Sequence, residues 1–230
     1  MLLKNTLAVG IVAAVISFSA NANSGKDINA GEASTDSPTS AVEKLAMASQ
    51  LIDYGVENQD PLVLLVAARM QAAIPTKEDK QSKQVTGNGL SESATKKSSD
   101  PQLSPLELAR ELATEQQLQP VLALIDAQEE VRARGLVGGP AIHSDRVKAR
   151  RNDIYTLNFK GGEQAAVFVS GDGDTDLDLY VYDENGNQIC KDTDGSDTML
   201  CRWTPRWTGE FEIKIKNLGT VYNDYTMIFE

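Results

Sequence analysis

The sequence has 230 residues, enough for one large or two small domains, and it carries 33 Asp and Glu residues against 22 Lys and Arg residues, a net charge of -11. This balance argues against a nucleic-acid ligand, because phosphate binding needs Lys and Arg clustered on one face. It also disfavours binding to an anionic membrane surface.

Residues 1–22 have the composition of a secretory signal peptide. Lys4 precedes an apolar run from Leu7 to Phe18, and Ala20-Asn21-Ala22 places small residues where a signal peptidase cleaves, so cleavage is predicted before Asn23. The alternative is an uncleaved anchor, but the apolar run is shorter than the ~18 to 20 residues that a membrane span needs. We therefore expect an extracytoplasmic protein, periplasmic or secreted, with no stable membrane insertion after cleavage.

Residues 23–39 and 40–135 differ in composition. The first segment is rich in Ser, Gly, Asp and Asn and has few apolar residues, which predicts a disordered leader. Residues 40–135 are expected to form two helical hairpins. A capping box at Ser40 and the Asp60-Pro61 pair predict the starts of the first two helices.

The second hairpin is predicted after a polar segment, residues 76–103, which we interpret as a flexible linker or a long loop. Ser104-Pro105 with Glu107 predicts the third helix, and a fourth helix is expected to end at Gly135. The apolar faces of these helices are expected to pack on one another. A peptide-binding groove between them is the alternative.

Gly138-Gly139-Pro140 predicts a hinge over residues 136–152. The sole histidine, His143, falls in this segment and is expected to be solvated. The basic residues from Arg146 to Arg151 are expected either to lie against the acidic region that follows or to stay solvated.

From residue 153 onward, apolar residues recur at every second position, which is typical of strands. Turn residues separate seven candidate strands: Ile154–Phe159, Gln164–Ser170, Leu177–Tyr182, Gln188–Lys191, Thr198–Trp203, Glu210–Lys216 and Tyr225–Phe229. The pattern predicts an antiparallel β-sandwich of jelly-roll or immunoglobulin-like type over residues 153–230. The expected fold class is thus α+β and multidomain, with a small all-α unit before an all-β sandwich.

Cys190 and Cys201 are the two cysteines of the sequence. An even number in an exported chain predicts a disulfide bond, which would pin the acidic loop between them. A catalytic redox pair is the alternative, but the two cysteines lack the Cys-x-x-Cys spacing.

Several motifs within 153–230 resemble the bacterial pre-peptidase C-terminal domain, a β-sandwich related to collagen-binding modules. They are Asp174–Asp183, Asn185-Gly186, Thr208–Ile213 and Asp224–Met227. The resemblance covers about a third of the chain. It implies an extracytoplasmic setting and an accessory, binding role beside secreted peptidases. It does not imply an activity, because the region before it does not resemble a peptidase.

The acidic loops suggest a calcium site, because this cation takes several oxygen ligands and loops rich in Asp, Asn and Gly supply them. The candidate ligands are Asp172, Asp174, Asp176, Asp194 and Asp197. An EF-hand is excluded because Leu177 stands where its loop needs glycine. Some collagen-binding relatives use an acidic segment before the first strand, whereas that segment is basic here. The alternative is that these aspartates end strands and keep the domain soluble.

Aromatic side chains are the candidate contacts for a sugar or protein ligand: Tyr180, Tyr182, Trp203 and Trp207. The two tyrosines are expected on the outer face of the sandwich, opposite Leu179 and Val181. Their alternative role is packing between neighbouring strands.

The sequence predicts a non-enzymatic binding or accessory protein. It contains neither a His-Glu-x-x-His motif nor a Gly-x-Ser-x-Gly elbow. The expected partner is an unidentified protein or polysaccharide, and calcium is the one cofactor considered. Two alternatives stay open: a hydrolase with an acidic site among the aspartates, and a structural envelope protein that recruits a partner through its helices.

Overall fold

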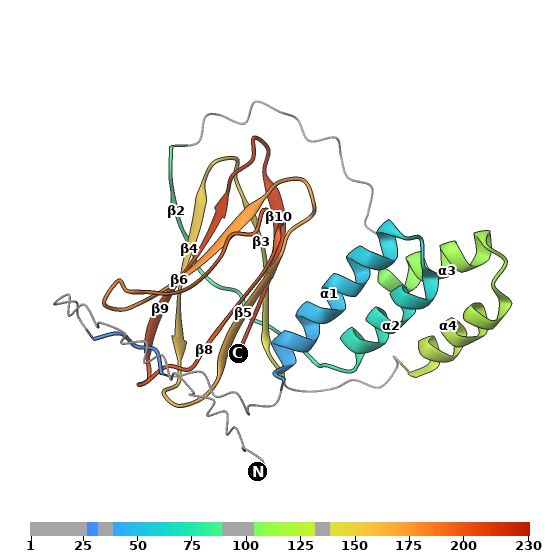
Figure 1. Ribbon diagram of the computed structural model, residues 1–230, viewed down its shortest axis with the longest axis horizontal. Helices are drawn as coiled ribbons and strands as arrows, with labels where there is room; N and C mark the ends of the chain where they lie inside the picture. The colour runs from blue at the N-terminus through green and yellow to red at the C-terminus, as the bar shows by residue number, and fades with distance from the viewer. Residues whose placement is uncertain (1–26, 32–38, 89–103, 132–138) are drawn as a thin grey trace, which may run out of the picture.

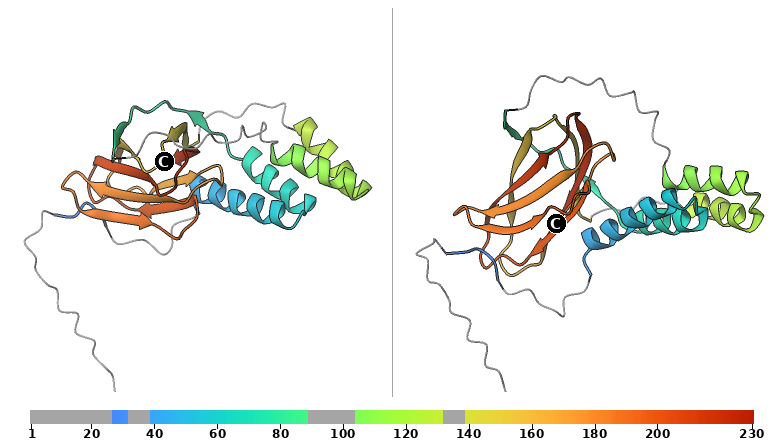
Figure 2. Two further views of the ribbon diagram at one scale, coloured as in Figure 1. Left: turned by 90° about the horizontal axis from the view of Figure 1, so that it is seen from above. Right: turned by 45° about the horizontal axis from the view of Figure 1, so that its top comes forward.

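The computed structural model describes residues 27–31, 39–88, 104–131 and 139–230. Four helices in the N-terminal half stand beside a two-sheet β-sandwich (Figures 1 and 2), so the expected fold class is confirmed. The predicted signal peptide lies outside the described residues. Of the helices that the structure describes, none combines the length and apolar character needed to cross a membrane.

The helices begin at the caps that the sequence predicts. Their bounds are α1 Ala41–Glu57, α2 Pro61–Ala72, α3 Pro105–Glu115 and α4 Gln119–Val131. Ser40 and Ser104 each form a complete capping box with the glutamate three residues later, and Asp60 accepts from the first free N–H groups of α2. Successive helices pack on one another around Leu64, Leu65, Leu106 and Ile125. The expected packing of the apolar faces is therefore observed.

Each sheet of the sandwich has five strands. The strand order is β1-β3-β10-β5-β8 in sheet A and β2-β4-β9-β6-β7 in sheet B. The bounds are β1 Lys77–Glu78, β2 Gln84–Thr86, β3 Ala141–Val147, β4 Asn152–Phe159, β5 Ala165–Ser170, β6 Leu177–Asp183, β7 Gln188–Asp192, β8 Thr198–Trp203, β9 Gly209–Asn217 and β10 Asn223–Phe229. All seven predicted strands are present, and β1 pairs with β3 in parallel while every other pairing is antiparallel.

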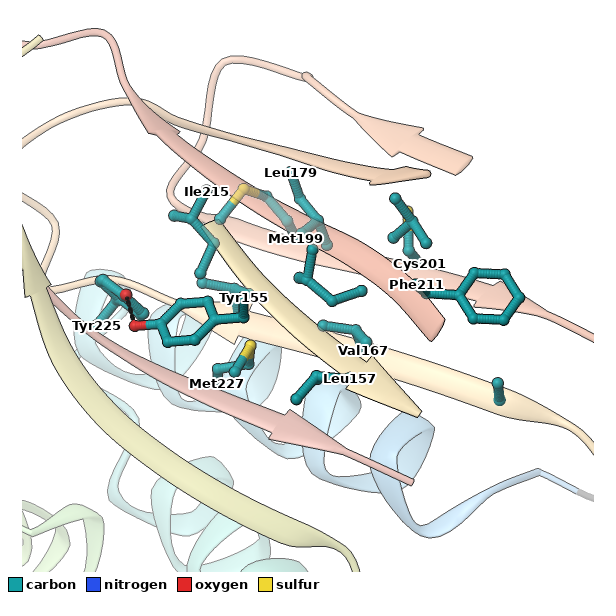
Figure 3. Packing of buried hydrophobic residues seen from close by; sticks show 14 of the residues in the cluster. Tyr155, Leu157, Val167, Leu179, Met199, Cys201, Phe211, Ile215, Tyr225 and Met227 are labelled. Atoms are coloured by element: carbon teal, nitrogen blue, oxygen red, sulfur yellow. Dashed lines mark hydrogen bonds between the residues drawn. The ribbon is translucent and has the colours of Figure 1, made fainter. Parts of the chain in front are cut away.

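The sandwich core lies between the two sheets, where inward side chains alternate with outward ones. Leu179 and Val181 of β6 lie opposite Ile215 and Ile213 of β9, and all four are fully buried. Figure 3 shows the aromatic ring of Phe211 at one end of this core and the hydroxyl groups of Tyr155 and Tyr225 meeting at the other. The second end is therefore polar although it is buried.

The structure places a strand where the sequence predicts a hinge. β3 occupies residues 141–147, and its inward positions are His143, Asp145 and Val147. Polar residues at two of these three positions hide the alternation that marks a strand. His143 is 7% exposed, so the expectation that it is solvated is wrong.

The predicted linker also contributes to the sandwich. Residues 77–86 supply β1 to the edge of sheet A and β2 to the edge of sheet B, and the chain between them crosses from one sheet to the other. At the opposite side, Cys190 of β7 and Cys201 of β8 form the predicted disulfide, with a Cα–Cα distance of 5.9 Å. Both open sides of the sandwich are thus bridged between the sheets.

Five residues of the predicted disordered leader are part of the fold. Residues 27–31, the blue segment near the N-terminus in Figure 1, lie against one end of the sandwich, where Asn29 is fully buried. The other leader residues, 23–26 and 32–38, lie outside the described residues.

Candidate binding cleft

A cleft of about 1210 Å³ opens between the helical unit and the outer face of sheet A. The N-terminal half of α1 packs on this face through Val42 and Leu45, which meet Phe168 and Ile228. Toward its C-terminal end α1 leaves the sheet (Figure 1), and the cleft occupies the space that results.

The floor of the cleft is built from cross-strand rows on β3, β10 and β5, whose outward side chains change in character along the strands. Ile142, Ile228 and Phe168 form an apolar row beneath α1. Ser144, Thr226 and Ser170 form a hydroxyl row, in which Ser144 and Thr226 lie 3.2 Å apart. Next along β3 and β10 come Arg146 and Asp224, a charged row.

The walls of the cleft come from three helices. α1 contributes Ile52, Asp53 and Val56, α2 contributes Gln71, and the start of α3 contributes Pro105 and Leu108. At the point where α1 leaves the sheet, the hydroxyl groups of Ser49 and Ser170 lie 3.3 Å apart. The open cleft therefore has a partly apolar wall facing a hydroxyl-lined floor.

The charged end of the cleft is acidic. Its lining includes Asp53, Asp172 and Asp224 and one guanidinium-bearing residue, Arg146. Asp145 also borders the cleft, but its side chain points into the sandwich, where it pairs with Lys83. The guanidinium of Arg146 forms a bidentate ion pair with the carboxylate of Asp224, with N–O distances of 2.5 and 2.9 Å. Burial, together with the nearby Asp197 and Glu57 carboxylates, raises the pKa of Asp53. This end of the cleft is thus suited to a cationic group.

A buried polar network adjoins the acidic end of the cleft. Lys83, from the segment between β1 and β2, places its Nζ 2.8 Å from both Asp145 and Asp153. Tyr225 donates its hydroxyl hydrogen to Asp153 over 2.9 Å, and Tyr155 donates to Asp145 over 3.1 Å. Each carboxylate therefore has both the lysine and a tyrosine as partners.

The pKa values in this network follow from burial and from the shared lysine. Burial raises the pKa of Asp153 and outweighs the Lys83 ammonium and the Tyr225 hydroxyl, which act in the opposite direction. Burial also opposes ionisation of the more exposed Asp145, but contacts with Lys83 and the Arg146 N–H hold its pKa below the ordinary value. The pKa values of both tyrosines are raised by burial, so both stay protonated donors.

His143 belongs to the same network. Its Nδ1 accepts a hydrogen bond from the Gln81 N–H at 3.1 Å, and its Nε2 lies 3.5 Å from Asp145. The imidazole therefore anchors the segment between β1 and β2 from inside the sandwich. In this position it is a structural residue.

The candidate calcium ligands lie on two loops in contact with each other. The Gly171 N–H donates to the Asp197 carbonyl at 2.8 Å, and the Leu177 N–H donates to the Ser196 carbonyl at 3.1 Å. Asp194 accepts from both the N–H and the hydroxyl of Ser196, at 2.9 and 2.7 Å. The structure thus brings the two acidic segments together.

Several of these carboxylates already accept backbone N–H groups. Asp172 accepts from Asp224 at 2.9 Å and from Asp174 at 3.3 Å. Asp197 accepts from Gly173 at 2.5 Å. These bonds stabilise the turns, as the alternative interpretation of the aspartates expects. Within the described ranges, no three or more His, Cys, Asp or Glu side chains are arranged to hold a metal ion.

Among the acidic residues that the structure describes, Asp176 differs because its buried Oδ1 has no hydrogen-bond partner. Its pKa is raised by burial and by the neighbouring carboxylates of Asp178, Asp194 and Asp197. A cation at this point would lower that repulsion. Calcium binding at these loops stays a prediction.

The tryptophans have different surroundings. Trp203 is 6% exposed, and its ring packs against Phe159 and Phe211 in the core, so its assignment as a ligand contact is corrected. Strand alternation places it inward with Cys201 of the same strand. Trp207 is 36% exposed, and its Nε1 donates to Glu184 at 2.5 Å.

Tyr180 and Tyr182 lie side by side on the outer face of sheet B. Their ring centroids are 6.3 Å apart with an interplanar angle of 14°, and Lys214 Nζ lies 5.8 Å from the centre of the Tyr180 ring. Both rings are half-buried. The pair is therefore outward-facing, as predicted, and also packs as the alternative interpretation expects.

Sequence reasoning missed the residues that complete the cleft and its buried network. Lys83 lies in a polar segment with several other lysines, and nothing in the local pattern distinguishes it. Asp153 stands two residues before the apolar Tyr155, and Asp145 stands two residues before Val147, so each shares the inward-facing strand positions with an apolar residue. That spacing marks inward-facing carboxylates. Such residues require a buried counter-charge.

The disulfide bears on the compartment of the protein. Disulfides persist in oxidising surroundings such as the periplasm and the extracellular space. The Cys190–Cys201 bond therefore agrees with an extracytoplasmic location.

Comparison with known proteins gives likeness of fold alone. No family model matches the chain, and no curated protein matches its sequence. Among solved structures, the periplasmic inhibitor of g-type lysozyme PliG from Aeromonas hydrophila is 16% identical, with 40% of this chain and 84% of that chain covered and a TM-score of 0.32.

Two further solved structures are similar to the same extent. The Yersinia pseudotuberculosis-derived mitogen is 11% identical, covering 40% of this chain and 86% of its own, with a TM-score of 0.34. The pre-peptidase C-terminal domain of collagenase from Bacillus anthracis is 11% identical, covering 38% and 87%, with a TM-score of 0.30. The pre-peptidase C-terminal domain, which residues 153–230 resemble in sequence, is thus among the similar solved structures.

Proposed function

We propose that this protein is a non-enzymatic, extracytoplasmic binding protein that holds a polypeptide segment of a partner in the cleft between α1 and sheet A. The observation that carries the proposal is the graded floor of the cleft, which passes from apolar to hydroxyl to charged side chains within a few residues. A peptide segment with both apolar and charged side chains would complement such a floor.

The residues that line the cleft indicate which residue types the bound peptide should contain. Ile52 and Leu108 offer an apolar wall to an aliphatic or aromatic side chain. The hydroxyl row offers hydrogen bonds to a polypeptide backbone. The carboxylates at the far end favour Lys or Arg, since they outnumber the single guanidinium. We therefore propose an extended peptide with an apolar residue followed by a basic one.

The experiment is a selection of random 12-residue peptides on the immobilised chain without residues 1–22. Enriched peptides are expected to pair apolar residues with Lys or Arg. Ser144→Arg fills the exposed centre of the floor and is expected to weaken their binding at least ten-fold. Asn158→Arg adds the same group to an exposed outer position of sheet B and should leave binding unchanged. Equal binding to both variants would overturn the proposal.

A polysaccharide ligand is the second candidate, and the stacked Tyr180–Tyr182 pair is the observation that favours it. Aromatic rings offer flat apolar surfaces to sugar rings. A glycan array probed with the chain tests this candidate. Binding should then be lost in Tyr180→Ala with Tyr182→Ala and kept in Ser144→Arg, the reverse of the result expected for the peptide cleft.

A further inference from the structure

One end of the sandwich holds residues 27–31 by hydrogen bonds that converge on Asn29. Its backbone N–H donates to Asp183 at 2.9 Å. Its side-chain oxygen accepts from the N–H groups of Arg206 and Trp207, at 2.9 and 3.1 Å. Its side-chain nitrogen donates to the Trp207 carbonyl at 3.1 Å. Both ends of this buried amide are therefore matched to groups of opposite hydrogen-bonding character.

The residues on either side of Asn29 are held through their backbone. The Asp27 carbonyl accepts from the side-chain amides of Asn185 and Asn187, at 3.0 and 3.2 Å. The Gly31 N–H donates to the Thr204 carbonyl at 2.7 Å. The site thus forms hydrogen bonds to the backbone at both ends of the segment and to one side chain at its centre.

Apolar burial contributes little to this contact. Ile28, the large apolar residue of the segment, is 49% exposed, and the two residues that follow Asn29 are alanine and glycine. The segment is therefore retained mainly by directional bonds. Recognition of this kind depends on the identity of the buried polar side chain, because a mismatched group is left without partners.

The receiving surface is fixed by bonds within the sandwich. Asp183 accepts from the N–H groups of Asn185 and Asn187, at 3.0 and 2.8 Å, which orient its carboxylate toward the segment. Gly209 lies beside the Asn29 amide, and a Cβ there would come within 3.1 Å of the amide nitrogen. Contacts within the sandwich, and not contacts with residues 27–31, thus set the shape of this site.

We infer that the turn 183–187 and the loop 204–207 form a peptide-binding site selective for an extended segment with asparagine at its centre, which the chain's own residues 27–31 occupy. An aspartate at the same place would set a carboxylate oxygen against the Trp207 carbonyl and the Glu184 carboxylate. A glutamine adds a methylene that the closed site does not accommodate. Alanine leaves the Arg206 and Trp207 N–H groups without their partner.

The first test measures amide hydrogen exchange of residues 27–31 in the chain without residues 1–22. Protection is expected in the unmodified chain and in Ile28→Ala, which alters an exposed side chain. Asn29→Asp is expected to lower protection at least ten-fold while the protection of β9 stays unchanged. Equal protection in Asn29→Asp and Ile28→Ala would overturn the inference.

The second test asks whether the site takes the segment from outside. A fluorescent peptide with the sequence of residues 25–33 is added to the Asn29→Ala chain, whose own segment is released. We expect binding to this chain, at least ten-fold weaker binding of a peptide that carries Asn29→Asp, and no binding to the unmodified chain, where the tethered segment competes at high effective concentration. A peptide that binds equally well with aspartate would contradict selectivity for asparagine.

Discussion

Nζ of Lys83 lies 2.8 Å from Oδ2 of Asp153, a carboxylate whose side chain is 1% exposed. The lysine comes from the segment that bridges the two sheets, and the carboxylate comes from β4 in the sandwich. Nζ also donates to the Arg146 carbonyl at 2.7 Å. The bridging segment therefore supplies the counter-charge that the sandwich needs, and the two are expected to unfold together.

Lys83→Met is expected to destabilise the sandwich by about 3 kcal/mol, because it leaves a buried carboxylate without its ion-pair partner. Urea unfolding followed by tryptophan fluorescence measures this loss. Lys80→Met is the matched control, because Lys80 is 86% exposed and its nearest carboxylate oxygen, on Glu78, is 3.9 Å away. A loss no larger than that of the control would mean that the buried pair contributes no net stability.

The loss of stability caused by Lys83→Met should also become smaller as the pH falls. Burial raises the pKa of Asp153 above its unfolded value, so its protonation favours the folded state at low pH, and this contribution is lost as the pH rises through the folded pKa. Without the lysine the folded pKa rises further. The difference in urea midpoint between the variant and the unmodified chain is thus expected to be smaller at pH 4.5 than at pH 7.

Asp183 is expected to give the opposite pH dependence. Burial acts to raise its pKa, but N–H groups of Asn29, Asn187 and Asn185 donate to it and hold the pKa below the ordinary value. The stability that it contributes is therefore present above the unfolded pKa and lost as the pH falls through the folded one. The NMR amide shift of Asn29 should therefore move toward the unfolded value only at a pH below the range in which an ordinary aspartate titrates.

Asp183→Asn supplies the comparison for this titration. The variant keeps the size of the side chain but removes the titrating group that accepts from Asn29. The acid-dependent shift of the Asn29 amide should disappear. An unchanged titration would mean that another group controls the attachment of residues 27–31.

The strands of the sandwich could be predicted from the sequence where one face is uniformly apolar. Leu177, Leu179 and Val181 alternate with outward residues, and the structure buries all three. β3 lacks this signal because its inward side chains include His143 and Asp145. Asp145 is paired with Lys83 and His143 accepts from the Gln81 N–H, and both partners lie about sixty residues earlier in the chain. No local pattern contains that relationship.

For the candidate sites too, local features could be predicted from the sequence and long-range contacts could not. The candidate calcium ligands could be named from the sequence because they end predicted strands, and the structure brings their two loops into contact. The cleft requires α1 to lie on sheet A, which depends on tertiary packing of Val42 against Phe168 and Ile228. Asn29 carries no periodic signal, because hydrogen bonds rather than apolar burial hold its segment. Composition alone therefore assigned it to a disordered leader.

The disulfide is expected to stabilise the protein by about 3 kcal/mol on the chain-entropy model, since it closes a short loop between β7 and β8. Cys190→Ala with Cys201→Ala tests this value in urea under non-reducing conditions. Unfolding of the unmodified chain in a reducing agent is the control and should give a similar loss. No loss in either experiment would contradict a stabilising role for the bond between the sheet edges.

Calcium binding by the acidic loops is predicted to raise the melting temperature of the chain at millimolar concentration, because a cation would relieve the repulsion around Asp176. Asp176→Asn should remove the calcium response and leave the other turns intact. Glu163→Gln, on an exposed turn at the opposite end of β5, is the control. Absence of both heat and a melting shift in calorimetry would remove the metal site.

Gly55→Ala is expected to destabilise the helical unit, although the same change in an ordinary helix interior stabilises it by about 1 kcal/mol. A Cβ at this buried glycine would lie 2.8 Å from Cγ of Leu64, at the crossing of α1 and α2. Neither helix can yield without moving the packed core around Leu64, so a loss of about 1 to 3 kcal/mol should appear in thermal unfolding followed at 222 nm. Tyr54→Ala removes an adjacent side chain that is 55% exposed and serves as the control. A gain in stability for Gly55→Ala would mean that α1 and α2 can separate at this crossing, and the wall of the cleft would then be adjustable.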